Sequence, residues 1–255
     1  VWMGRGRGWL PAASVALTLL GVRPCNADFA PPVRVSDGTG RATQANTGID
    51  VANNAYIAIV ADERITLKGI GPGFAVNVPI PVGGLGQGDP DLATNTSGHT
   101  FLSFSQLDED AAPGEGREIY YTRNPGSGFQ TPVNISRSRN DDSASRLALD
   151  FHGKPHITWV QRVQEETPEG IQEGTQVMYW HFGMAQDEPA VVVAKGDYPA
   201  IFVDSKDIVH LVYSRVTNLS TDLWYNNNAG GTFSNERRAT TTPFERMTTR
   251  SQTSS

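Results

Sequence analysis

Four short segments of the chain share one pattern of apolar and polar positions. They cover residues 56–59, 101–104, 156–159 and 210–213. In each segment the second and fourth residues are large and apolar, and the third is small or β-branched. A period of two residues is typical of a β-strand, so we expect a strand in each place. The opposite face of each strand is only partly polar, which predicts that both faces of the sheet are packed.

These strands belong to a longer repeated unit. The unit starts at Asp50, Asn95, Asp150 and Asp204, at intervals of 45, 55 and 54 residues. A preceding strand is predicted at residues 91–94, 146–149 and 200–203, and a following strand at residues 118–121, 176–179 and 222–225. The outermost strand is clearest at residues 129–136. A repeat of this length that contains only strands predicts a β-propeller.

The sequence therefore predicts an all-β protein, a β-propeller of four-stranded antiparallel blades with about four blades present. Residues 29–36 match residues 129–136 at Phe, Pro, Val and Ser, so the body is expected to open with an outer strand. In closed propellers such a strand completes the last blade. Residues 240–255 are polar and do not supply the inner strands of that blade. We expect an incomplete ring, with a complete four-bladed ring as the alternative.

The first 27 residues have the three parts of a secretory signal peptide. Arg5 and Arg7 form a positive region, residues 9–22 are apolar, and small residues precede a cleavage site after Ala27. A buried first helix is the alternative. The predicted organisation is a signal peptide at residues 1–27, propeller blades at residues 28–240 and a polar tail, truncated or disordered, at residues 241–255. We expect a secreted or periplasmic bacterial protein whose mature chain does not insert into a membrane.

The charge and the cysteine content of the chain narrow the expected partners. The formal net charge is −6, and nucleic acids select for basic surfaces, so we expect no nucleic-acid partner. Cys25 is the only cysteine and lies in the predicted signal peptide, so we expect no disulfide and no thiolate metal site in the mature protein. A glycan or a protein is the expected partner.

Two predicted turns resemble the Asp-box, or BNR repeat, of sialidase-like propellers, a hairpin with the pattern Ser-x-Asp-x-Gly-x-Thr-Trp. Residues 226–233 keep Gly230, Thr232 and an aromatic residue, Phe233, but have Asn in place of Ser and Asp. Residues 122–129 keep Gly126 and an aromatic residue. The chain thus resembles the sialidase-like superfamily over residues 29–239. The resemblance implies a structural role for these turns, on the face opposite to the ligand site.

The ligand face of a propeller is built from two kinds of loop. One kind joins the second and third strands of a blade, here at residues 106–117, 161–175 and 215–221. The other kind joins successive blades, here at residues 37–47, 82–90, 137–145 and 195–198. The candidate ligand-binding residues on or near this face are Arg137, Arg139, Arg146, Arg162, Arg215 and Tyr198.

An arginine fork suits a substrate carboxylate, which is how sialidases hold their substrate. However, the Arg-Ile-Pro motif of that family is absent, and its nearest match is the string Arg64-Ile65-Thr66. Scattered surface arginines explain the candidates as well as a binding cluster does. No set of catalytic residues is predicted.

Three further groups of side chains have more than one interpretation. Asp108 and Asp110 lie in an acidic loop that suits calcium, although a solvated acidic loop explains them too. His156 and His210 occupy one repeat position, and we interpret them as packing residues rather than as a shared metal site. Aromatic residues recur in the third strand and predict packing between blades. Trp180 departs from this repeat and is the best candidate for stacking on a sugar ring.

Three hypotheses for function follow. The first is an exported, sialidase-like propeller that binds a glycan or a protein through its loop face without catalysis. The second is an exo-acting glycoside hydrolase of the sialidase type whose site is completed by further blades. The third is a structural repeat of a larger surface protein. The sequence favours the first, because no catalytic motif is recognised.

Overall fold

The computed structural model describes residues 34–35, 41–50, 53–70, 84, 86–108, 116–168, 170–185, 188–217 and 220–240. The predicted signal peptide, the polar tail after residue 240 and most of the predicted strand at residues 29–36 lie outside these ranges. The chain divides into two units, Val1–Arg34 and Val35–Ser255. The description below concerns the second unit.

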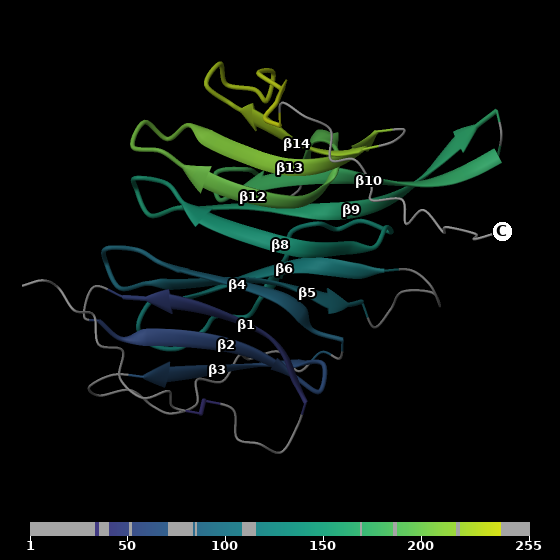
Figure 1. Cartoon of the computed structure of the whole chain (residues 1–255). Helices are drawn as coiled ribbons and strands as arrows, with labels where there is room; N and C mark the ends of the chain where they lie inside the picture. The colour runs from purple at the N-terminus through teal and green to yellow at the C-terminus, as the bar shows by residue number, and fades with distance from the viewer. Residues whose placement is uncertain are drawn as a thin grey trace, which may run out of the picture. The chain divides into compact units, whose positions relative to one another are not determined.

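In its described ranges the second unit contains four antiparallel sheets that are arranged as the blades of a β-propeller (Figure 1). The predicted all-β fold and the four blades are thus confirmed. The sheets follow one another along the chain, and each is a meander. The first sheet contains β1 (Ala42–Ile49), β2 (Ala55–Ala61) and β3 (Arg64–Ile70); the second contains β4 (Gly88–Thr94), β5 (Thr100–Leu107), β6 (Arg117–Asn124) and β7 (Val133–Asn134). The third contains β8 (Asp142–Leu149), β9 (Pro155–Thr167), β10 (Gly170–His181) and β11 (Val191–Lys195); the fourth contains β12 (Asp197–Val203), β13 (Val209–Thr217), β14 (Ser220–Asn227) and β15 (Arg237–Arg238).

Apolar side chains join each sheet to the next. In the second sheet Leu102 and Phe104 pack against the first sheet, whereas Phe101 packs on the other side, against Trp159 of the third sheet. Val177 of the third sheet belongs to a further cluster that continues into the fourth. The alternation of β5 therefore places apolar residues on both faces, as the sequence predicts. Among the described residues, no such cluster joins the fourth sheet to the first.

One turn recurs between the first and second strands of all four sheets, and it explains why the repeated unit starts with Asp or Asn. A side-chain oxygen of the first turn residue accepts a hydrogen bond from the backbone N–H four residues later, and the residue before that N–H has a positive φ. The accepting residues are Asp50, Asn95, Asp150 and Asp204, at distances of 2.8, 3.0, 2.7 and 2.9 Å; the positive-φ residues are Asn53, Gly98, Gly153 and Asp207.

A β-bulge recurs near the start of the inner strands β4, β8 and β12. The pairing register shifts there, and the bulged residues Asp89, Ala144 and Tyr198 have φ values of 49°, 55° and 49°. A bulge interrupts the two-residue period. For this reason the sequence pattern shows only the later part of each inner strand.

The predicted loops between blades are therefore shorter than expected. Parts of residues 37–47, 82–90, 137–145 and 195–198 belong to β1, β4, β8 and β12. In β1 the register also shifts, between Ala42 and Gln44.

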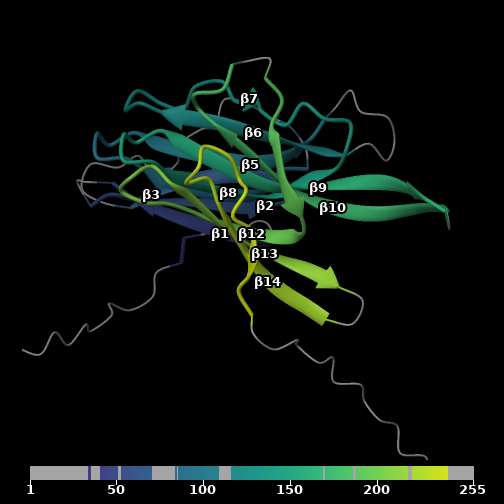
Figure 2. The ribbon, with the colours of Figure 1, turned by 90° about the horizontal axis from the view of Figure 1, so that it is seen from above.

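Two loops that were predicted on the ligand face are strand hairpins instead. Residues 161–175 continue β9 and β10, which stay paired out to Thr167 and Gly170. This hairpin projects beyond the neighbouring strands in both views (Figures 1 and 2). Residues 215–221 likewise continue β13 and β14, paired out to Thr217 and Ser220. These parts have few buried neighbours and no apolar alternation, so the sequence carries no strand signal there.

The second sheet also shows how its outer turn is stabilised. Asn124 Oδ1 accepts hydrogen bonds from the N–H groups of Gly126 and Gly128 at 2.8 and 2.9 Å, and both glycines have a positive φ. Phe129 follows them and is buried in the cluster between the first and second sheets. The asparagine thus caps the backbone of this turn.

The turn that begins at Asp150 offers a test of the repeat. We expect Asp150→Ala to lower the free energy of unfolding by about 1–2 kcal/mol, because a backbone N–H loses its acceptor. Asp150→Asn is expected to lower it less, since Asn95 fills the same position in the second sheet. Urea unfolding of the two variants measures the difference, and equal losses would contradict this account of the turn.

Candidate functional site

The arginine pocket, defined by Arg117, Arg139, Asp141, Arg162 and Glu173, has a volume of about 640 Å3. Arg117 is the first residue of β6, Arg162 and Glu173 lie on the β9–β10 hairpin, and the other two precede β8. All five come from segments that the sequence assigns to the ligand face. The pocket therefore lies where the second and third sheets meet, next to the projecting hairpin.

Asp141 holds the two sides of this pocket together. Its Oδ1 accepts a hydrogen bond from the backbone N–H of Arg117 at 3.0 Å. Its backbone oxygen accepts another from the N–H of Arg162 at 2.9 Å, and its Oδ2 lies 3.7 Å from Arg162 Nε. One carboxylate thus fixes the start of β6 to the middle of β9.

Two of the arginines that line this pocket have side chains without protein partners. Within the described part of the chain, the side chains of Arg117 and Arg139 make no hydrogen bond or ion pair. Two arginines of the fourth sheet, in contrast, are held by acids: Arg215 pairs with Glu236, and Arg238 Nη2 lies 2.7 Å from Asp222 Oδ1. A guanidinium presents five donors that suit a carboxylate, sulfate or phosphate group. The pocket therefore offers donors to an anion.

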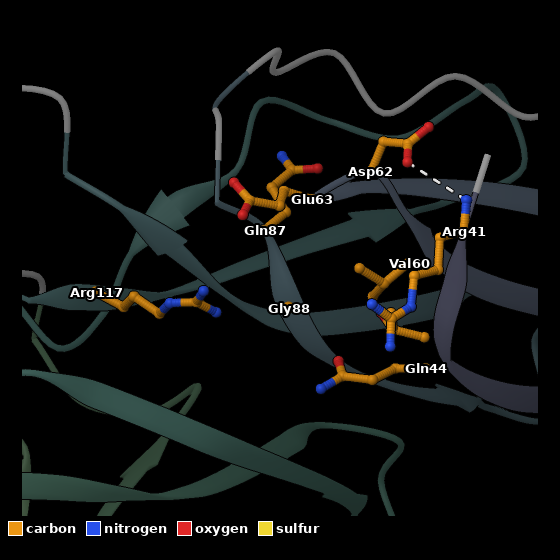
Figure 3. Close-up of a pocket in the computed structure, with 9 residues that line it drawn as sticks. Arg41, Gln44, Val60, Asp62, Glu63, Gln87, Gly88 and Arg117 are labelled. Carbon is orange, nitrogen blue, oxygen red and sulfur yellow. Dashed lines mark hydrogen bonds between the residues drawn. The ribbon is translucent and has the colours of Figure 1, made fainter.

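Arg117 also lines a second pocket, of about 340 Å3, between the first and second sheets (Figure 3). Arg41 lies on the other side of this pocket, with the acidic pair Asp62 and Glu63 at its rim. A Cβ atom at Gly88 would lie 2.8 Å from Arg117 Nη1. The guanidinium of Arg117 thus lies close to Gly88, on the side of this second pocket.

Two buried carboxyl residues, Asp142 and Glu118, directly follow residues of the arginine pocket in the sequence. Asp142 is fully buried and accepts hydrogen bonds from Trp159 Nε1 at 2.9 Å, Gln161 Nε2 at 3.2 Å and Ser138 Oγ at 2.6 Å. Burial raises the pKa of Asp142 to about 7.

Glu118 has a similar environment. It accepts hydrogen bonds from the hydroxyl of Ser136 and from the N–H of Ser138, the latter at 3.1 Å, and burial raises its pKa. A third carboxyl, that of Asp91, accepts a hydrogen bond from the N–H of Leu147 at 2.8 Å and joins the second sheet to the third. Burial also raises the pKa of Asp91. These groups serve the fold and do not line the arginine pocket.

The structure brings two of the six candidate residues together. Arg139 and Arg162 share the arginine pocket. Arg137 lines a different pocket, on the outer strands of the second sheet. Arg146 lies on β8, where it donates to the backbone oxygen of Ser145 at 2.7 Å.

The remaining two candidates lie on the fourth sheet. Arg215 is held by Glu236 and lies over Trp224, with 4.5 Å between the guanidinium carbon and the ring centroid. Tyr198 is three-quarters exposed at the bulge of β12. Sequence reasoning did not single out Arg117 or Asp141. Both lie in predicted ligand-face loops, Arg117 at the end of residues 106–117 and Asp141 in the middle of residues 137–145, and this was the one available signal.

The repeated histidines have a structural role. His156 Nδ1 lies 2.6 Å from the hydroxyl of Tyr179, and its Nε2 lies 3.6 Å from Asp150. His210 repeats the arrangement with Tyr225 at 2.7 Å and Asp204 at 3.4 Å. Both ring nitrogens of each histidine thus lie close to a polar group of the protein, which agrees with a structural role for this position.

Neither a metal-binding cluster nor a membrane-spanning helix occurs in the described ranges. No three side chains of His, Cys, Asp or Glu lie close enough there to hold a metal ion. Asp110, one of the two candidate calcium ligands, falls outside those ranges, whereas Asp108 lies within them. Over the same ranges, no helix has the length and apolar character needed to cross a bilayer.

Comparison with known proteins gives information on the fold. No protein-family model and no curated protein matches the sequence. A thermostable family-43 glycoside hydrolase is similar in structure, with a TM-score of 0.53, 11% identity, and coverage of 82% of this chain and 75% of that one. An alpha-L-arabinofuranosidase from Lactobacillus brevis has a TM-score of 0.49 at 11% identity, covering 78% and 72% of the two chains. A xylan beta-1,4-xylosidase from Bacillus halodurans has a TM-score of 0.47 at 12% identity, covering 80% of this chain and 42% of that one. At such identities the similarity shows the fold that the chain shares with β-propeller glycoside hydrolases.

The raised pKa of Asp142 predicts a pH dependence of stability. Between pH 3.8 and about 7 the folded protein keeps the proton that the unfolded chain releases, so the free energy of unfolding falls as the pH rises through this window. We expect the difference between wild type and Asp142→Asn to fall by about 1.4 kcal/mol per pH unit from about pH 5 to about pH 6.5. Urea unfolding at several pH values measures it. Parallel curves for the two proteins would show that Asp142 has an ordinary pKa.

Proposed function

We propose that this β-propeller is an exported module that binds glycans carrying carboxylate or sulfate groups, and that it does so in the arginine pocket without cleaving them. The observation that carries the proposal is that three arginines line one pocket and that the side chains of two of them, Arg117 and Arg139, have no partner in the described part of the chain. A solvated surface arginine is ordinary, but two without acidic partners in one pocket form a site for an anion.

The rest of the pocket supports a sugar as the carrier of that anion. Its volume of about 640 Å3 lies in the range of small-ligand sites. Asn140 and Gln164 add amide groups that both donate and accept hydrogen bonds, as sugar hydroxyls require. The structural neighbour with a TM-score of 0.53 is a glycoside hydrolase by name, which is consistent with a glycan as the ligand.

The carboxyl groups support binding over hydrolysis. A typical glycosidase places two carboxyl groups on either side of the scissile bond. Here Asp142 and Glu118 are buried and occupied by internal hydrogen bonds, and Asp141 is paired with Arg162. Of the carboxyl groups that line the pocket, this leaves Glu173 as the one without a partner in the described ranges, where a glycosidase needs two. An exo-acting glycoside hydrolase completed by residues outside the described ranges is the alternative, and the same experiment distinguishes it.

We also propose that the protein belongs with the sialidase-like propellers. The support is the pair of turns at residues 122–129 and 226–233. In the first, Asn124 caps the turn; in the second, Asn226 Oδ1 accepts from the N–H of Asn227 at 2.9 Å and of Asn235 at 3.1 Å. Phe233 packs on Tyr179, with ring centroids 4.9 Å apart.

The arginine pocket is tested with an array of carboxylated, sulfated and neutral oligosaccharides. We expect anionic members to bind and neutral counterparts to bind more weakly. Arg117→Ala and Arg139→Ala should each weaken binding about tenfold, because each removes charge-assisted hydrogen bonds. Arg123→Ala is the matched control, since Arg123 bonds to Gln130 on the outer part of the second sheet.

Two results would contradict this proposal. Equal binding of neutral and anionic sugars, or unchanged affinity in both pocket variants, would remove the arginine pocket as the site. Release of shorter sugars from any array member, followed by chromatography, would favour the glycoside hydrolase.

Export has a separate test. Expression of the full sequence in a bacterium should place the protein outside the cytoplasm, with a mass that corresponds to a first residue of Asp28. Mass spectrometry of the periplasmic and culture fractions measures this. Recovery of the uncleaved chain in the cytoplasm would contradict the signal peptide.

A further inference from the structure

A third pocket, the outer groove, lies between the outer part of the second sheet and the end of β10. Its volume is about 300 Å3, and it shares no residue with the arginine pocket. Val133 and Ile135 line it on the side of the second sheet, and Trp180, Phe182 and Met184 line it on the side of the third. Val133 and Phe182 are nearly half exposed, so this apolar lining is only partly covered by the protein itself.

The repeat identifies a hydroxyl group in this wall that lacks a partner. Tyr121, Tyr179 and Tyr225 occupy the same position of the third strand in their sheets. In the third and fourth sheets a histidine accepts or donates a hydrogen bond at the tyrosine hydroxyl, at 2.6 and 2.7 Å. In the second sheet Phe101 stands in place of the histidine and stacks on the ring of Tyr121.

Phenylalanine offers no hydrogen bond, so the hydroxyl of Tyr121 is buried without a partner in the described part of the chain. Only 6% of Tyr121 is exposed. A buried polar group without a partner is costly, and such groups in folded proteins call for an explanation. Tyr121 lines the outer groove, which offers one: a ligand in the groove satisfies the hydroxyl.

Trp180 is the second departure from the repeat in the same place. The residues at its position are Thr122 in the second sheet and Asn226 in the fourth. Its indole is tilted against Tyr121, with ring centroids 5.5 Å apart, and it remains partly exposed to the groove. Two departures from the repeat thus change the same pocket. Trp180 adds an aromatic surface, and Phe101 leaves the hydroxyl of Tyr121 without a partner.

The polar residues of the groove indicate the charge of the ligand. Asn134, Arg137 and Glu188 lie around the apolar part, and they carry one positive and one negative charge between them. A ligand with a single charge gains nothing net from this pair. An uncharged molecule with one apolar face and polar groups along its edge fits this lining. Its apolar face suits the indole of Trp180, and its polar edge suits the amide of Asn134 and the charged pair.

We propose that the outer groove binds one uncharged pyranose ring, with an apolar ring face on Trp180 and a ring hydroxyl bonded to Tyr121. The site is independent of the arginine pocket and does not require that the proposed anionic glycan binds there. A longer glycan with both neutral and charged units is able to occupy either site without the other.

The experiment follows the indole N–H signals of the isotopically labelled full-length protein by NMR. The probes are the methyl β-glycosides of glucose, galactose and xylose, at concentrations up to tens of millimolar. Cyclohexanol is the comparison, because it has an apolar ring without the ring of hydroxyls. Trp180→Phe assigns the signal, and the signal of the buried Trp159 reports that each variant remains folded.

The expected result is a saturable shift of the Trp180 signal with at least one glycoside and a much smaller one with cyclohexanol. Trp180→Ala should abolish binding, and Tyr121→Phe should weaken it roughly three- to tenfold while leaving thermal stability unchanged or higher, because it removes a hydroxyl without a partner. Phe151→Ala, which changes an exposed aromatic residue outside the groove, and Arg117→Ala should have no effect.

Three results would overturn the proposal. They are no shift with any of the glycosides, an equal shift with cyclohexanol, and unchanged affinity in Tyr121→Phe. The second would identify the groove as a site for an apolar side chain of a protein partner. Loss of anionic-glycan binding in Arg117→Ala with an intact Trp180 response would leave this site standing by itself.

Discussion

Every inner sheet of this protein must bury both of its faces, and the rest of the structure depends on that constraint. β5 shows it most directly, because Leu102 and Phe104 serve one interface and Phe101 the other. With both faces apolar, charged side chains gather toward the strand ends and the outer edges, and those within the inner strands, such as Asp91 and Arg146, are held by hydrogen bonds. Turns, bulges and pockets therefore gather at those ends, where the polar groups that bind ligands are also found.

The sequence predicts the strands wherever alternation is undisturbed. Residues 101–104 and 210–213 are read correctly, because each buried side chain faces a neighbouring sheet. The starts of β4, β8 and β12 escape prediction because the bulges at Asp89, Ala144 and Tyr198 break the period. The far part of the β9–β10 hairpin escapes it for another reason: pairing of the backbone, not burial, defines it.

The candidate site could be predicted only in part. Arg139 and Arg162 were found because they lie in ligand-face loops, but so does Arg215, which Glu236 occupies. Whether an arginine is available depends on an acid that is distant in the sequence and close in space. Sequence reasoning has no access to that pairing, so it could not separate Arg117 from the arginines that serve the fold.

In the second sheet Phe101 stands where the third and fourth sheets have a histidine, and this difference has a wider consequence. A repeat fold holds several copies of each stabilising contact, so the loss of one copy lowers the stability of the whole by a small share. The Asp–His–Tyr contact occurs in the third and fourth sheets, whereas Tyr56 and Phe101 stand at the histidine position in the first and second, so the architecture does not need the contact in every sheet. Redundancy of this kind allows a propeller to acquire a new binding surface by drift at one blade, without first building a new scaffold.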